Sequence, residues 1–299
     1  MTNQASTQKL HKKKRFDLVD VVLFLFLTAW GLIILLPFIN VIAISFSSYK
    51  EYLATPLLMF PKEPELKSYQ ELFEDGRIWI GYRTTLIIVL IGVPLSLFLT
   101  SSMGYALSRR KYPGKKLILM LVLFTMIFQG GIVPLYLVMK DLHLTNTIWS
   151  IILCSGMNTF YMILMYNYFQ SLPDSLVESA RLDGAGEWTI LFRVILPLSL
   201  PIIATVTLFY SVDKWNEWFN AMVFVRKAEI QPLQLILRSM ILDSQVANEA
   251  AATVAIEDRS FSSGIKMAAV VVTMLPIMCV YPFLQKHFAK GVMVGAIKA

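Results

Sequence analysis

Residues 172–197 read LPDSLVESARLDGAGEWTILFRVILP and form a polar interruption between two long apolar segments. A Pro-Asp pair near the start of this stretch predicts the beginning of a helix, with Asp174 or Ser175 as its N-cap. Gly184 and Gly186 predict the end of that helix after about two and a half turns, because glycine readily adopts the left-handed conformation that terminates helices.

The predicted helix is amphipathic and is followed by a second one. Leu176, Val177 and Ala180 share one face of the first helix by their i, i+3 and i+4 spacing. The second helix is expected over residues 187–195 and leads into a proline. A short amphipathic helix held by loops at a membrane surface is a candidate docking element.

The spacing of the small and charged residues is a further feature of this stretch. Glu178-Ser179-Ala180 is followed after three residues by Gly184, then after nine residues by Val194, and then by Leu196-Pro197. This pattern resembles the EAA loop of bacterial ABC importer permeases, Glu-Ala-Ala-x3-Gly-x9-Ile-x-Leu-Pro, with serine and valine as the departures. In that family the loop is a cytoplasmic coupling helix that fits a cleft on the ATP-hydrolysing subunit. The resemblance implies these ATPase-coupling residues: Glu178, Ala180, Arg181, Asp183 and Gly184.

A local structural role is an alternative to ATPase coupling at these positions. The Glu178 carboxylate suits a basic group on a partner, or else an intrahelical pair with Arg181 at i, i+3. Gly184 would form the turn between the helices, and the small Ala180 allows close approach to a partner surface. Asp183 would cap the second helix or the turn. Without a partner, the stretch would be an ordinary interfacial helix.

The composition predicts an integral membrane protein. The 299 residues are 56% hydrophobic and 16% charged, with a mean hydropathy of +0.61, whereas soluble domains carry about 25% charged residues. The net charge of +7 fits lysine and arginine in cytoplasmic loops and does not call for a nucleic-acid partner. The predicted fold class is an all-α membrane protein with six transmembrane helices, and the resemblance implies the type I ABC importer permease fold.

Six apolar segments have the roughly 20 residues needed to cross the hydrocarbon core. A Gln-Gly-Gly break is expected at 129–131, and a short interfacial helix at 68–75. The predicted spans are 19–45, 84–107, 117–139, 148–169, 198–225 and 265–284.

Six crossings place both termini on one side of the membrane. Basic clusters occur before the first span, at 109–116 and at 286–298, and the positive-inside rule makes their side cytoplasmic. The expected location is therefore the bacterial cytoplasmic membrane. The predicted organisation is a cytoplasmic tail (1–16), a six-span permease domain (17–290) containing the coupling loop (172–197) and an extracytoplasmic loop (226–263), and a cytoplasmic tail (291–299).

The sequence contains no motif for catalysis or for binding ATP. Gly-x4-Gly-Lys-Ser/Thr, HExxH and GxSxG are absent, and the three histidines do not cluster. We therefore expect no catalytic residue, no metal site and no bound cofactor in this chain. If the protein uses ATP, a partner subunit must bind it together with Mg²⁺.

Polar and aromatic residues near span ends are candidates for a substrate pathway, because rings stack on sugar CH faces and amides bond hydroxyl groups. In span four, Ser155, Asn158, Tyr161 and Met162 are expected near one helix face. The alternative is an interfacial aromatic belt with amides that join helices. The candidate pathway residues are Asn158, Tyr161, Trp215, Asn216, Trp218 and Asn220.

Two further segments resemble parts of maltose-type permeases. Residues 226–263 correspond to an outer loop that, in the permeases they resemble, reaches into the binding protein as a scoop. The alternative is a lid that packs on its own domain. The basic C-terminal tail resembles tails that touch the ATPase dimer, or else anchors on anionic lipid.

The chain as a whole resembles the second permease of carbohydrate ABC importers, including those for alginate- and pectin-derived oligosaccharides. The resemblance rests on Trp215-Asn216-Glu217-Trp218 and on the ending from Tyr281 to Lys298. It implies a homologous second permease, an ABC ATPase dimer, an extracytoplasmic solute-binding protein and an oligosaccharide substrate, all at the lipid membrane. Two alternatives stay open: a secondary transporter without an ATPase, with Asp213 and Glu217 as ion-coupling carboxylates, and a membrane scaffold.

Overall fold

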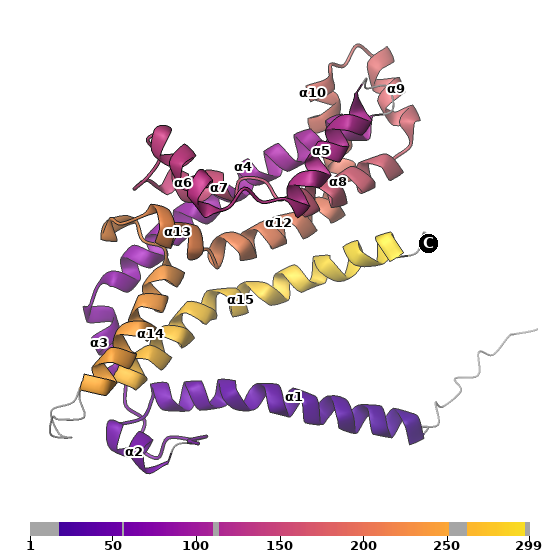
Figure 1. The fold of residues 1–299 in the computed structure, drawn as a ribbon. Coiled ribbons are helices and arrows are strands. Elements are labelled where there is room, and N and C mark those ends of the chain that lie inside the picture. The colour runs from indigo at the N-terminus through magenta and orange to yellow at the C-terminus, as the bar shows by residue number, and fades with distance from the viewer. Residues whose placement is uncertain (1–17, 56, 110–113, 251–261, 297–299) are drawn as a thin grey trace, which may run out of the picture.

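A computed structural model describes the backbone of residues 18–55, 57–109, 114–250 and 262–296, and the side chains of these residues except 243–250 and 280–296. Regular structure in these ranges is helical throughout (Figure 1). The predicted tail 1–16 lies outside the described residues. The helices are α1 Leu18–Ser45, α2 Tyr49–Ala54, α3 Lys67–Glu74, α4 Arg77–Ser108, α5 Lys115–Ile127, α6 Ile132–Asp141, α7 Ile148–Cys154, α8 Thr159–Ser171, α9 Asp174–Leu182, α10 Glu187–Ile190, a π-helical turn Leu191–Ile195, α11 Leu196–Leu198, α12 Leu200–Trp215, α13 Phe219–Phe224, a 3₁₀ turn Ala228–Ile230, α14 Leu233–Ala250 and α15 Ser262–Ala296.

The six-span fold is confirmed, but only half of the spans are continuous helices. Long apolar stretches of α1, α4 and α15 are each sufficient to cross a membrane. The other three candidate spans are bent pairs: α5 with α6 at 113°, α7 with α8 at 51°, and the α10–α11 segment with α12 at 89°. A helix is present where a short interfacial helix was predicted at 68–75, namely α3.

The bend between α5 and α6 lies where the glycines predicted it. Gly131 has a φ of +86°, a conformation that costs glycine little and other residues much. The bend between α7 and α8 was not predicted. Span four is interrupted from Ser155 to Asn158, so Ser155 does not share one helix face with Asn158 and Tyr161 as expected. A buried lysine from another span, Lys214, donates to the carbonyl groups at this interruption.

The predicted fifth span is also shorter than expected. Helix α12 ends at Trp215, and the chain turns before α13. The Asn216 side-chain amide donates to the Val212 carbonyl at 2.9 Å, and Glu217 accepts from the Asn220 backbone N–H at 3.0 Å. The Glu217 carboxylate thus satisfies a backbone N–H that a continuous helix would have bonded to a carbonyl four residues earlier, and the Asn216 amide adds a second bond to a carbonyl at the helix end.

Much of the predicted loop 226–263 is a helix. In α14, Leu233, Ile236 and Met240 are 0%, 2% and 7% exposed and pack between α4 and α15. Their i, i+3 and i+7 spacing is that of a buried helix face. This half of the segment therefore packs on its own domain. The scoop predicted from this loop would have to come from its second half, where residues 251–261 lie outside the described residues.

Helix α4 is central to the bundle and packs against α7, α8, α12 and α14. Small residues allow this close packing: a Cβ at Gly81 would lie 2.9 Å from the Leu233 Cα. By contrast, α1 diverges from the bundle (Figure 1), and its buried residues are confined to its last turn. Helix α15 continues to Ala296, so the C-terminal tail predicted at 291–299 begins within a helix.

Candidate functional site

Helix α9 forms the first half of the loop between spans four and five. Pro173 occupies the N-cap position, and no side chain caps the helix there. The predicted caps, Asp174 and Ser175, were wrong, because Pro173 is extended (φ −58°, ψ 131°) and Asp174 is already helical. In the first turn, the Asp174 carboxylate interacts favourably with the positive end of the helix dipole.

The predicted glycine turn after α9 is confirmed in detail. Gly184 has a φ of +80°. Its N–H donates to the Arg181 carbonyl and the N–H of Ala185 donates to the Ala180 carbonyl, both at 3.0 Å. This pair of bonds is a Schellman motif, which ends a helix with glycine in the left-handed conformation.

Asp183 does not cap the second helix. It is the C-cap residue of α9, while Gly186 precedes α10 without a side-chain cap. The second helix is longer than predicted, since α10 continues through the π-helical turn and α11 to Leu198.

The two halves of the loop are joined by Glu187, which also joins them to α4. The Arg181 guanidinium donates to Glu187 Oε1 from Nη2 at 2.6 Å and from Nε at 3.0 Å. The Tyr105 hydroxyl on α4 donates to Glu187 Oε2 at 2.6 Å. We call Arg181, Glu187 and Tyr105 the loop joint. Arg181 thus pairs with Glu187 and not, as the alternative held, with Glu178.

Sequence reasoning missed Glu187 and Tyr105 as site residues. The ion pair spans six residues across a glycine turn, and Tyr105 is 82 residues from Glu187. No helical spacing rule connects such positions. The only signal was an acidic residue directly after the Gly-Ala-Gly turn.

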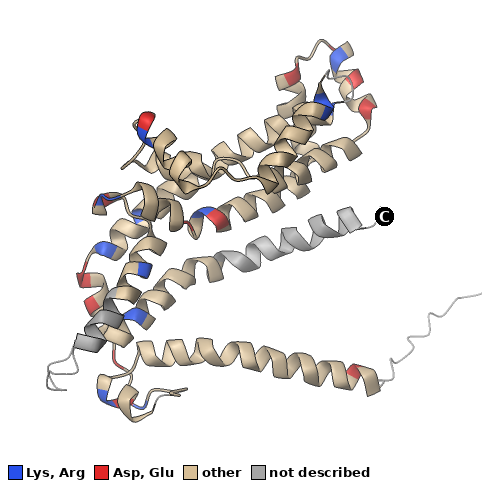
Figure 2. Ribbon diagram, viewed as in Figure 1, with Lys and Arg blue, Asp and Glu red and all other residues tan. Residues whose placement is uncertain are grey.

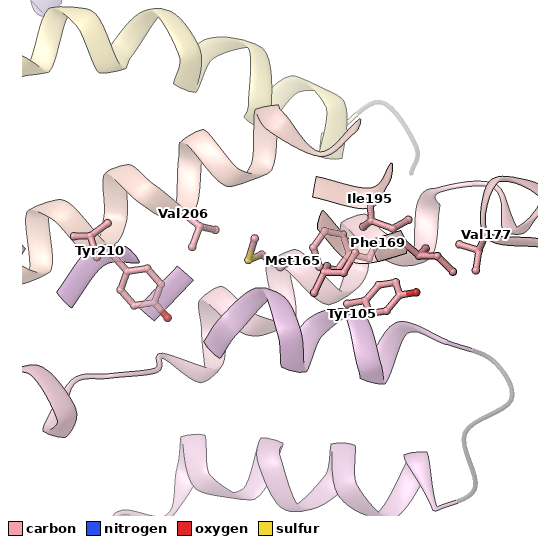
Figure 3. Packing of buried hydrophobic residues seen from close by; sticks show 10 residues of the cluster. Tyr105, Met165, Phe169, Val177, Ile195, Val206 and Tyr210 are labelled. Carbon is pink, nitrogen blue, oxygen red and sulfur yellow. The ribbon is translucent and has the colours of Figure 1, made fainter. Parts of the chain in front are cut away.

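The two faces of α9 differ as an amphipathic docking helix requires. Val177 is 4% exposed and belongs to the apolar cluster shown in Figure 3, with Ala180 packed against it. Glu178 and Ser179 are exposed, and Leu182 is 89% exposed at the tip of the helix. Charged residues gather in this loop, whereas they are sparse along the apolar spans (Figure 2). The buried face therefore fixes α9 to the bundle, and the opposite face presents Glu178, Ser179 and Leu182.

The second candidate site is the interruption between α7 and α8. Lys214 of α12 is only 1% exposed, and its Nζ donates to the Ser155 carbonyl and hydroxyl at 2.7 Å each and to the Ile152 carbonyl at 3.2 Å. We call Lys214, Ser155 and Ile152 the break joint. A cation suits the carbonyl end of α7, where backbone oxygens lack helical partners. Gly92 leaves room for the lysine stem, because a Cβ there would lie 3.2 Å from Lys214 Cε.

Sequence reasoning named the neighbours of Lys214 but not the lysine itself. A lysine inside a predicted span was the available signal, since ionisable groups at membrane depth need partners. Its partners lie about 60 residues earlier, so spacing gave no indication of them.

Tyr210 connects the interruption to α4 and α12. Its hydroxyl lies 2.6 Å from Thr100 Oγ1 and accepts from the Asn158 backbone N–H at 3.0 Å. The Asn158 side-chain oxygen accepts from the Phe160 backbone N–H at 2.9 Å and so caps α8. The Tyr161 hydroxyl donates to Asp213 Oδ2 at 2.9 Å. The predicted pathway residues Asn158 and Tyr161 are therefore brought together, beside α12.

The other four predicted pathway residues lie around the turn between α12 and α13. Trp215 is 9% exposed and packs in the core near Tyr82. Trp218 is covered by the Arg238 guanidinium, 4.0 Å from its ring centroid. The side-chain amide of Asn220 donates to Glu217 Oε2 at 2.9 Å, and Asn216 is exposed.

A metal site finds no support in the part of the chain that the structure describes. No group of three or more His, Cys, Asp or Glu side chains there is arranged to hold an ion.

Known proteins similar to this chain are transport permeases. The polygalacturonan/rhamnogalacturonan transport system permease protein YtcP of Bacillus subtilis (strain 168) is 38% identical over 94% of this chain and 98% of its own length. Protein LplC of the same organism is 39% identical over 98% and 99%. A solved bacterial ABC transporter involved in the import of the acidic polysaccharide alginate contains a chain with a TM-score of 0.83, 31% identity and coverage of 96% and 100%.

A family description matches most of the chain as well. The match to the binding-protein-dependent transport system inner membrane component covers residues 83–294, which include the loop joint and the break joint. The resemblance stated from the spacing of residues 172–197 is thereby confirmed. This protein belongs to the binding-protein-dependent transport system inner membrane components, the permease subunits of ABC importers.

Proposed function

We propose that this chain is one of two permeases in an importer that moves an oligosaccharide into the bacterial cytoplasm. Support comes from the relatives named for polygalacturonan/rhamnogalacturonan transport and for alginate import. As a permease, the chain is not itself the ATPase. Membership of this family argues against the secondary-transporter alternative, which has no ATPase partner.

The proposed assembly contains a homologous second permease, an ABC ATPase dimer that binds ATP and Mg²⁺, and an extracytoplasmic solute-binding protein. Both termini and α9 would face the cytoplasm, as the basic clusters predict. In this arrangement α9 meets the ATPase through Glu178 and Leu182, with the turn from Asp183 to Gly184 at the contact.

The observation that carries this proposal is the loop joint. Glu187 accepts hydrogen bonds from Arg181, in the docking helix, and from Tyr105, in a membrane span. Movement of α9 would therefore move α4 with it. Val177 adds apolar contact to the same cluster as Tyr105 and Tyr210 (Figure 3).

From α4, polar contacts continue to the interruption in span four. Thr100, about one and a half turns before Tyr105 on α4, bonds Tyr210, which bonds the backbone of Asn158. A shift of α4 would thus reach the candidate pathway residues Asn158 and Tyr161. We propose that ATP closes the ATPase dimer, α9 and α4 move together, and the pathway opens alternately to each side of the membrane.

The proposed pathway wall consists of Asn158 and Tyr161, with Asn216, Trp218 and Asn220 nearer its outer end. Asp213 would orient the Tyr161 hydroxyl, while the Tyr161 ring packs against Phe209 and Tyr210 at centroid distances of 5.3 and 4.9 Å. Trp215 would support the wall from behind, because its ring lies in the core.

Co-purification tests the class of transporter. Tagged chain extracted in mild detergent is expected to bring a second permease and an ATPase, whose hydrolysis rises when the binding protein and its oligosaccharide are added. A chain that purifies alone after gentle extraction would contradict the proposal.

Substitution of Glu178 tests the coupling role. In proteoliposomes, Glu178→Ala is expected to lower ATP-driven uptake by about tenfold or more, because the carboxylate lies on the proposed ATPase contact and not in the fold. The matched control is Asp141→Asn, an exposed carboxylate at the end of α6. Unchanged uptake with Glu178→Ala would disprove the assignment.

A further inference from the structure

A cavity of about 400 Å³ lies between the end of α4 and the start of α10. It is separate from the interruption in span four, and the loop joint forms part of its wall. Its lining includes Ser102, Tyr105, Arg109, Arg181, Glu187 and Trp188.

The α4 side of this cavity changes from apolar to cationic along its length. Phe98, Ser102, Tyr105 and Arg109 follow one another at i, i+4, i+7 and i+11, so they form one stripe on α4. The apolar end lies deeper in the span, and the arginine lies at the boundary between the span and its loop. This order matches a phospholipid, whose acyl chains lie below an anionic headgroup.

Exposed aromatic rings extend the apolar end of the cavity. Phe98 stacks with Trp188 and Phe192, with ring centroids 6.0 and 6.4 Å apart. All three rings are substantially exposed, at 44%, 59% and 47% respectively. Aromatic rings at this level of a membrane protein are typical of contact with lipid near the headgroup.

At the polar end of the cavity, Ser102 and Arg109 have polar atoms that can still form hydrogen bonds. Ser102 Oγ is buried and has no hydrogen-bond partner among the described residues, although buried hydroxyl groups are normally satisfied. The two guanidinium groups outnumber the single carboxylate, Glu187, whose two oxygens already accept from Arg181 and Tyr105. Arg109 lies over the Tyr105 ring at 4.7 Å and donates from Nε to Ser108 Oγ, which leaves its terminal nitrogens for another acceptor.

We propose that this cavity binds an anionic phospholipid, with the phosphate at Arg109 and Ser102 and the acyl chains along Phe98, Trp188 and Phe192. A free phosphate offers the same headgroup chemistry, but it would leave the exposed rings uncovered. The bound lipid would lie against the loop joint, so it would brace the contact between α4 and α10.

Native mass spectrometry of the tagged complex, released from nanodiscs, tests this assignment. We compare phosphatidylglycerol with phosphatidylcholine of the same acyl chains. Wild-type protein should retain phosphatidylglycerol preferentially, and Arg109→Gln should bind it about fivefold more weakly, the effect of one basic group at a membrane surface. The matched control is Arg193→Gln, an exposed arginine of the same loop that does not line the cavity.

A second measurement locates the lipid without relying on Arg109. Brominated phosphatidylglycerol should quench tryptophan fluorescence more than brominated phosphatidylcholine, and Trp188→Phe should abolish that difference. Inorganic phosphate should not compete. Equal retention of both lipids, equal loss in the two arginine variants, undiminished excess quenching in Trp188→Phe, or displacement by phosphate alone would each overturn the proposal.

Discussion

The loop joint and the break joint both hold a helix end through a charged side chain, but their surroundings differ. In the loop joint, the Arg181 and Glu187 side chains are 47% and 54% exposed. In the break joint, Lys214 is 1% exposed and contacts three oxygen atoms. The first lies beside solvent, and the second lies within the bundle.

Because the two joints differ in burial, we expect them to contribute differently to the stability of the fold and to transport. Exposed ion pairs contribute about 0–1 kcal/mol to stability, because water and salt screen them. Removing one partner of a buried charged hydrogen bond costs several times more, since the remaining groups stay unsatisfied. We therefore expect the break joint to determine whether the protein folds, and the loop joint to determine whether ATP hydrolysis reaches the membrane spans.

The largest expected effect is that of Lys214→Met. Methionine keeps the apolar stem but leaves the Ile152 and Ser155 carbonyls without their donor, at a cost of about 3 kcal/mol. The folded yield and the melting temperature in detergent should both fall sharply. Lys227→Met, at an exposed position, should change neither, and equal behaviour of the two variants would refute the structural role of Lys214.

An intermediate effect is expected from Tyr210→Phe. The ring still fills its buried site, but Thr100 and the Asn158 backbone N–H lose their partner, which costs about 1–2 kcal/mol. Thermal unfolding should detect the loss. Tyr168→Phe is the matched control, because its hydroxyl makes only a 3.4 Å contact with the Leu198 carbonyl. A larger loss in the control would show that the Tyr210 hydroxyl is not structural.

Local features of this fold could be predicted from the sequence, whereas features stabilised by distant residues could not. The bend at Gly131 and the turn at Gly184 were predictable, since a left-handed glycine is a local property. The interruption at Ser155–Asn158 was not, because Lys214 stabilises it from another span. The loop prediction for 226–263 was wrong over α14, because polar residues are spread through this segment although Leu233, Ile236 and Met240 form an apolar helix face.

The same reasoning applies to the coupling loop. Its docking helix could be recognised from the spacing of Glu178, Gly184 and the terminal Leu-Pro. The contact that joins it to α4 could not, because Tyr105 meets Glu187 only in the folded chain.

The smallest effect on stability and a large effect on function are expected from Glu187→Gln. Glutamine keeps the size of the side chain but removes the charge that Arg181 binds, and this pair is exposed. The melting temperature should stay close to that of wild type. Coupling between distant sites is typically worth about 5- to 150-fold, so transport should respond far more than folding.

The amount of oligosaccharide taken up per ATP hydrolysed, measured in proteoliposomes for wild type and Glu187→Gln, tests the central claim most directly. Glu229→Gln, an exposed carboxylate outside the loop, is the control. We predict that the ratio falls by about tenfold in Glu187→Gln while ATP hydrolysis continues and the control matches wild type. An unchanged ratio in Glu187→Gln would contradict the claim that the loop joint carries movement from α9 to α4.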